Sequence, residues 1–170
     1  DIACVKVNVD SVLIDTFNQT DLSLLARPSG NSLLVTIDSN EMHANLVCKK
    51  GQNGTEPELI APISMLFIPT SARDAAEKSK PVQIQGGWPA INAVIDDLTY
   101  GNMRLGKLEL VARNTPSAKG QLWKITKLNL SNSAAQLHSS GSWLKGFDGG
   151  NETNLLINTN INNLGGLLNR

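Results

Sequence analysis

Alternation of apolar and polar side chains is the feature that most limits what this chain can fold into. Apolar residues recur at every second position in segments such as 33–37, 42–48, 91–95 and 108–112, which is the pattern of β-strands with one apolar face. Gly, Asn and Pro cluster between these segments at intervals of roughly 8 to 15 residues, a spacing typical of sequential hairpins. The sequence therefore predicts a mainly β protein built on a curved antiparallel sheet of about ten strands.

Two polar segments and the C-terminal residues depart from this alternation. Residues 49–58 are polar and contain glycine, which predicts a loop. The Ala-rich centre of the other polar segment predicts a short helix near 70–80, and leucines at helical spacing predict a second one near 163–169. We expect residues 1–170 to form a single β-rich domain. If the domain is divided, the polar segment 70–88 is where we expect the boundary.

The charge balance narrows the classes of partner. The 170 residues include 15 basic and 15 acidic side chains, so the formal net charge is zero. Zero net charge argues against nucleic acid as a partner and against electrostatic docking on an acidic membrane surface. No segment approaches the ~20 consecutive apolar residues of a membrane-spanning helix. The chain begins with Asp1 rather than Met, so we expect it to be processed or to be a fragment of a longer protein.

Residues that carry catalytic chemistry are sparse. His43 and His138 each stand alone at a polar position of a strand-like segment, so we expect solvated surface imidazoles. No phosphate-binding loop, dinucleotide fingerprint or serine nucleophile elbow is present. The adjacent carboxylates Asp96 and Asp97 would point to opposite faces of a regular strand. Because the apolar alternation slips at this pair, it predicts a β-bulge. We therefore expect no catalytic residue, no metal site and no cofactor.

The two cysteines are far apart in sequence. Cys4 and Cys48 both lie in strand-like segments and form no Cys-x-x-Cys motif. They could form a disulfide between neighbouring strands in an oxidising compartment. Two buried free thiols are an equally good interpretation.

One apolar face per strand fits two architectures. The faces could close into the core of a β-sandwich, or they could line an open, curved sheet that binds acyl chains. Periodicity does not separate the two, but aromatic residues make up only 4% of the chain. Few aromatics favour the open sheet over a compact sandwich. In a sandwich, Trp88, Trp123 and Trp143 would be the candidates for a carbohydrate site.

A succession of strand motifs resembles a known family. The motifs are PAINAVIDDLTYG at 89–101, LGKLEL at 105–110, WKITKLNL at 123–130 and LHSSGSW at 137–143. Their order and spacing resemble the C-terminal region of YhdP-type members of the AsmA-like family of Gram-negative bacteria. The resemblance covers residues 89–168 well, whereas residues 1–69 fit its strand style with looser motifs.

The resemblance implies a non-enzymatic role in lipid transfer. Such proteins are periplasmic, are anchored in the inner membrane by a helix expected outside this chain, and form an elongated, taco-like β-groove. They carry phospholipid toward the outer membrane and support its barrier integrity, so phospholipid acyl chains are the implied partner. The periplasm would also permit a Cys4–Cys48 disulfide. A β-sandwich interaction or carbohydrate-binding module at the cell surface is the alternative.

For the groove we assign the lining to the apolar alternation. The expected lipid-binding residues are Leu33, Val35, Ile37, Met42, Ala44, Leu46, Ile91, Ala93, Ile95, Leu108 and Leu110.

Overall fold

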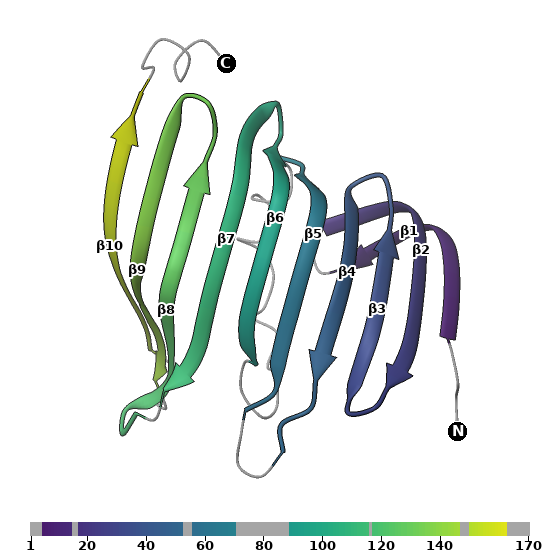
Figure 1. The fold of residues 1–170 in the computed structure, drawn as a ribbon, viewed down its shortest axis with the longest axis horizontal. Coiled ribbons are helices and arrows are strands. Elements are labelled where there is room, and N and C mark those ends of the chain that lie inside the picture. The colour runs from purple at the N-terminus through teal and green to yellow at the C-terminus, as the bar shows by residue number, and fades with distance from the viewer. Residues whose placement is uncertain are drawn as a thin grey trace.

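The fold is one ten-stranded sheet whose strands lie in the order of the sequence (Figure 1). The computed structural model describes residues 5–14, 17–52, 56–70, 89–115, 117–146 and 150–162. The strands are β1 (Val5–Ile14), β2 (Phe17–Ser29), β3 (Ser32–Asp38), β4 (Met42–Lys49), β5 (Glu58–Ile68), β6 (Ala90–Tyr100), β7 (Met103–Thr115), β8 (Gly120–Ser131), β9 (Ala135–Gly146) and β10 (Asn151–Ile161). None of these described residues forms a helix.

Three predictions fall on other parts of the chain. Apart from Thr70, the helix expected near 70–80 and the sub-boundary at 70–88 lie outside the described residues. The helix expected near 163–169 lies outside them as well.

The prediction of a purely antiparallel sheet is wrong at one place. Strands β5 and β6 pair in parallel, from Glu58 opposite Ala90 to Ile68 opposite Tyr100. A parallel neighbour requires a connection of a dozen or more residues, because the chain must return to the end where it started. Residues 69–89 provide that length. The polar segment 70–81 is therefore part of a crossover between two paired strands, and not only an interruption between hairpins.

The strand register gathers the apolar residues on one face. Ile37, Ala44, Ile63, Ile95 and Leu108 are paired neighbours in a row that crosses five strands. Paired residues point to the same side of a sheet, and successive residues point to opposite sides. The register therefore gives the sheet one apolar face and one polar face.

β-Bulges interrupt the register in four strands. Ser64 is the extra residue in β5, and the register between β6 and β7 shifts between Ile95 and Leu98, which confirms the bulge predicted at Asp96–Asp97. Leu105 is an extra residue in β7, and β8 is irregular between Ile125 and Leu128, against both of its neighbours. A bulge bends its strand and increases the local twist. Because the bulges of β5 and β6 lie side by side, both strands bend at the same level of the sheet.

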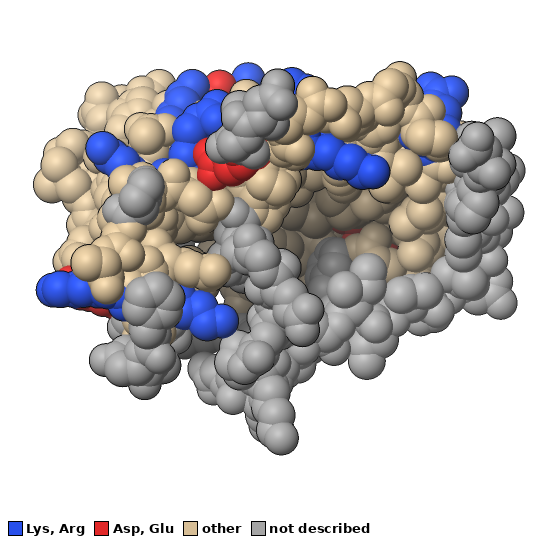
Figure 2. Space-filling view, turned by 90° about the horizontal axis from the view of Figure 1, so that it is seen from below, with Lys and Arg blue, Asp and Glu red and all other residues tan. Residues whose placement is uncertain are grey.

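The curved sheet is open and encloses a hollow. Strand β1 pairs only with β2, and β10 only with β9. The described strands pack mainly against their neighbours in the sheet, so no second described layer covers the apolar face. Figure 2, seen from the lower end of Figure 1, shows a hollow under an arch whose walls are mostly uncharged, with charged side chains on its outside and rim. We call this hollow the trough.

Strand β2 bends sharply at Asp21. This residue has a φ of 51°, in the left-handed region that non-glycine residues seldom adopt. Asn40, in the turn between β3 and β4, donates from Nδ2 to the Asp21 carboxylate at 2.7 Å, and Glu41 binds Thr20 beside the bend. Beyond it, β1 and β2 leave the direction of the other strands (Figure 1). The β3–β4 turn therefore holds the bend in place.

Candidate functional site: the apolar face of the trough

The residues predicted to line a groove share one face of the sheet. Leu33, Cys48, Leu59, Ile91 and Ala112 form a second row of paired neighbours, four positions along each strand from the row through Ala44. By strand pairing and alternation, this face carries Leu33, Val35, Ile37, Met42, Ala44, Leu46, Ile91, Ala93, Ile95, Leu108 and Leu110. The predicted residues thus lie on one face of four strands, β3, β4, β6 and β7, and β5, which lies between β4 and β6, was not in the predicted set.

Part of this surface is the core of the protein. Ala44, Ala61, Ile63, Ile95 and Leu98 are buried and in mutual contact. Other members of the predicted set pack against them and are partly buried, namely Ile37, Met42, Leu46, Ala93 and Leu108. Burying an aliphatic side chain of this size stabilises a fold by about 1.5–3 kcal/mol. The centre of the apolar face therefore holds the sheet together and is less accessible than its flanks.

The accessible apolar residues lie toward the flanks. Leu33 in β3 is 41% exposed, and Leu155 and Ile157 in β10 are 44% and 54% exposed. Ile157 pairs with Ser139, which pairs with Leu128, so it belongs to the trough face. Leu156, between the two, is 67% exposed on the opposite face. The predicted set omitted Leu155 and Ile157, although they follow the same period of two in the sequence.

Polar and aromatic side chains also enter the trough face. Ser139 is buried among apolar residues, and its hydroxyl has no hydrogen-bond partner in the described part of the chain. Trp123 and Trp143 are paired across β8 and β9, three residues from the ends of these strands. Both are half-buried, so neither is a fully exposed carbohydrate platform. Trp88 lies outside the described residues.

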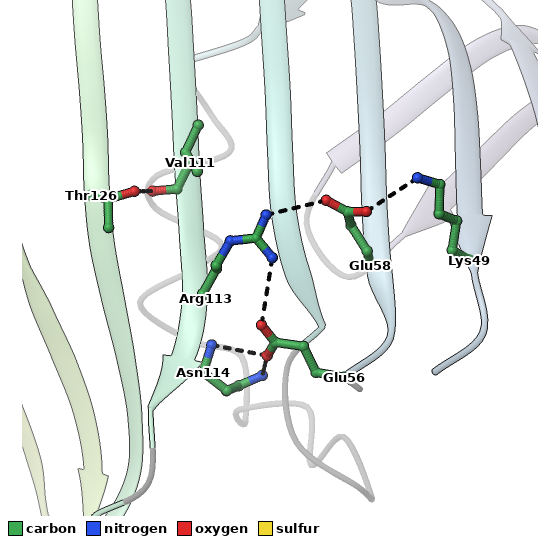
Figure 3. A network of polar contacts seen from close by, with 7 residues as sticks. All are labelled: Lys49, Glu56, Glu58, Val111, Arg113, Asn114 and Thr126. Atoms are coloured by element: carbon green, nitrogen blue, oxygen red, sulfur yellow. Dashed lines mark hydrogen bonds and ion pairs between the residues drawn. The ribbon is translucent and has the colours of Figure 1, made fainter. Parts of the chain in front are cut away.

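The opposite face carries an ion-pair network near the start of β5 (Figure 3). The Arg113 guanidinium lies 3.5 Å from the Glu58 carboxylate and 3.9 Å from that of Glu56. Lys49 approaches Glu58 from the other side at 3.3 Å. Asn114 donates its backbone N–H and its side-chain Nδ2 to Glu56, each at 3.0 Å. These contacts connect β4, β5 and β7 on the outside of the sheet.

A second charged group lies midway along β7 and β8. The Lys127 ammonium is 2.7 Å from Glu109 Oε2, and Lys107 and Asn129 also approach this carboxylate. The hydrogen bond from Lys127 holds the pKa of Glu109 below its ordinary value, and the bond from Asn129 acts in the same direction. Hydrogen bonds to an ionised carboxylate favour its charged form. Glu109 is therefore an anion that joins two neighbouring strands at neutral pH.

The two histidines are exposed and lie apart. His43 contacts Asp38 across the β3–β4 pair, and His138 Nδ1 is 2.9 Å from Asn129 Oδ1.

Of the two adjacent carboxylates in β6, Asp97 accepts two hydrogen bonds of 3.0 Å from the Arg104 guanidinium. Within the described ranges, no three His, Cys, Asp or Glu side chains come together as metal ligands would.

The expected disulfide between Cys4 and Cys48 stays a prediction. Cys48 is a half-buried free cysteine in β4, and Cys4 lies outside the described residues. Strands β2 and β3 separate β4 from β1, which begins at Val5.

Comparison with known proteins decides the family. The family model described as YhdP protein matches residues 3–170. The chain belongs to the YhdP family. No curated protein and no solved structure matches it. For this YhdP family member, a search of the described residues finds no helix long and apolar enough to cross a bilayer.

Proposed function

We propose that this chain is a non-enzymatic segment of a lipid-transfer conduit in the periplasm, part of an inner-membrane-anchored protein. It would carry phospholipid between the inner and outer membranes and so support the barrier of the outer membrane. One observation carries the proposal: a continuous apolar face lies on the hollow side of a sheet that no second described layer covers. Membership of the YhdP family supports the same role.

An apolar face of this kind is stabilised by apolar groups that cover it. Apolar surface in contact with water is unfavourable by about 25 cal/mol per Å², and acyl chains remove that contact without specific bonds. The exposed trough-face residues at the two flanks, Leu33 on one side and Leu155 and Ile157 on the other, offer aliphatic contacts and no charge, and the apolar face lies between them. A chain can therefore slide along it, while the headgroup stays in water at the mouth of the trough.

The open architecture weighs against the alternative. A sandwich module would need a second sheet over the apolar face, and the described strands form one open sheet. A carbohydrate site would use exposed aromatic rings, yet Trp123 and Trp143 are half-buried on the apolar side. We therefore assign the apolar face to acyl chains.

Two adjacent residues of β10 allow a matched test. A photo-crosslinking amino acid is placed at Ile157, on the trough face, or at Leu156, on the outer face. Both are exposed aliphatic positions, at 54% and 67%, so access to solvent and effects on folding are similar. Cells supplied with radiolabelled phospholipid are irradiated, and lipid attached to the purified protein is counted.

The proposal predicts strong labelling at Ile157 and background labelling at Leu156. A crosslinker at Leu33 should behave like Ile157, because it lies on the same face at the other flank. Equal labelling at both β10 positions, or none at Ile157 and Leu33, would overturn the assignment of the trough to lipid.

A further inference from the structure

A net charge of zero hides a separation of charge along the strands. We call the end of the sheet where β5 begins the basic end, and the end where it finishes the acidic end. The turn between β2 and β3 lies at the basic end, as do the loop before β5 and the turns that follow β7 and β9. The turns that follow β3, β6 and β8 lie at the acidic end.

Basic side chains gather at the basic end. Those described there are Arg27, Lys49, Lys50, Arg113, Lys119, Lys124 and Lys145. The acidic ones are Glu56, Glu58 and Glu152. At the acidic end the balance reverses, with Asp21, Asp38, Glu41, Asp96 and Asp97 against Arg104 and Lys107. Figure 2 looks at the basic end directly and shows Lys and Arg on the outside and upper rim of the arch over the hollow.

Among the described residues, ion pairs engage only part of this positive charge. Glu56 and Glu58 form ion pairs with Arg113 and Lys49. In the described part of the chain, no carboxylate forms an ion pair with Arg27, Lys50, Lys119, Lys124 or Lys145. Lys50, Lys119 and Lys124 are exposed. Their ammonium groups therefore lie at the surface with no described carboxylate in ion-pair contact.

The tryptophans of β8 and β9 lie at the same end. Trp123 and Trp143 are within three residues of the strand ends, and Lys145 follows Trp143 by two positions on the same face. Tryptophan beside lysine is typical of the boundary between bilayer and water, where an amphipathic ring and a cation meet headgroups. The mouth of the trough at this end therefore combines charge and aromatic surface.

We propose that the basic end docks on the surface of a bilayer that contains anionic phospholipids. Lipid phosphates would face the exposed lysines Lys50, Lys119 and Lys124, and the trough would open toward the headgroups. The zero net charge had argued against such docking, but attraction to a surface depends on the charges within a Debye length, about 8–10 Å at physiological salt. The inference goes beyond acyl-chain binding, since the docking needs no lipid in the trough.

Vesicle flotation with two charge-matched variants tests the proposal. One variant carries Lys50→Gln, Lys119→Gln and Lys124→Gln at the basic end. The other carries Arg104→Gln, Lys107→Gln and Lys127→Gln, and so loses the same charge from the acidic end and the middle of the sheet. The vesicles contain equal parts of phosphatidylglycerol and phosphatidylcholine, or phosphatidylcholine alone.

The wild type should float with the anionic vesicles and not with the neutral ones, and added salt should release it. Each surface lysine contributes roughly fivefold to binding, so the basic-end variant should bind about a hundredfold more weakly. The second variant should bind within about threefold of the wild type. No binding by the wild type, or equal losses in both variants, would overturn the proposal.

An orientation measurement keeps the test decisive if a triple variant folds poorly. In a chain with Cys4 and Cys48 replaced by Ser, an environment-sensitive dye is attached at Ser117→Cys, in the turn between β7 and β8, or at Asn102→Cys, between β6 and β7. Anionic vesicles should shift the emission at position 117 and leave position 102 unchanged. A shift at position 102 alone, or at both positions alike, contradicts docking through the basic end. Crosslinking at Ile157 remains a separate result, so docking and lipid uptake can fail independently.

Discussion

Thr20 and Glu41 are joined twice across the bend in β2. The Thr20 backbone N–H donates to Glu41 Oε2 at 2.7 Å, and the Thr20 hydroxyl donates to Oε1 at 2.6 Å. One carboxylate therefore fixes both the backbone and the side chain of the residue before Asp21. Hydrogen bonds to charged groups contribute more than neutral ones, about 1.5–3 kcal/mol.

The first prediction concerns this carboxylate. Glu41→Ala should lower the free energy of unfolding by about 2–3 kcal/mol, because Thr20 loses an ionised acceptor for both donors. Urea denaturation followed by circular dichroism measures the change. Glu152→Ala is the control, since this exposed carboxylate accepts only from Asn154 within the described residues, and the loss should stay below about 0.5 kcal/mol. Similar losses in both variants would mean that the bend does not depend on Glu41.

The second prediction concerns a glycine where the backbone leaves no room. Gly106 has a φ of 93°, and a Cβ there would lie 2.3 Å from the carbonyl oxygen of Ser131. Gly106→Ala should therefore cost roughly 2–4 kcal/mol of stability, from the left-handed backbone and the clash together. Gly30→Ala, at a φ of 57° with no atom within 4 Å, should cost only about 1–2 kcal/mol. A Gly106 variant as stable as the Gly30 variant would contradict the close approach.

The third prediction separates the core from the accessible surface of the same face. Ile95→Ala should destabilise the protein by about 2–4 kcal/mol, because Ile95 is only 7% exposed and its removal leaves a cavity. Ile157→Ala should cost less than about 0.5 kcal/mol, because this side chain is already in solvent. Thermal and urea denaturation of the two variants gives the comparison. A large loss for Ile157→Ala would show that β10 is covered in the folded chain.

The fourth prediction is a pH effect at Glu109. The lowered pKa of this carboxyl means that its contact with Lys127 stabilises the fold at neutral pH. This contribution should fade as the pH falls from the ordinary glutamate value through the lowered one. Lys127→Met should raise the pKa of Glu109 toward 4.5, since the main cause of the shift is removed. Carboxyl chemical shifts followed by NMR during an acid titration measure both states, and an unchanged pKa in the variant would contradict the role of Lys127.

The sequence could predict the apolar face because side chains alternate with a period of two. That rule placed Leu33, Ala44 and Leu110 on one surface, and the break in the rule at Asp96 located a bulge. It could not distinguish core from accessible surface, because Ile95 and Ile157 follow the same alternation. Their difference in exposure depends on whether neighbouring strands pack against the position from both sides.

The sequence pattern also could not predict whether β6 runs parallel or antiparallel to β5. A strand between two neighbours shows the same alternation whether it runs parallel or antiparallel to them. The relevant signal was the length of the polar segment before Pro89, which is long enough to return the chain to the other end of the sheet. The separation of charge could not be predicted for the same reason, since it depends on which turns lie at the same end of the sheet.

The single parallel pair gives the sheet an electric dipole along its strands. If β6 ran antiparallel to β5, the turn that carries Lys119 and the end of β9 that carries Lys145 would lie beside Asp38 and Glu41, and their charges would largely cancel. Because β6 starts where β5 starts, the lysines of the second half of the chain join Lys49 and Lys50 from the first half. One change of strand direction thus makes an electrically neutral chain into a polarised body with a distinct positive pole.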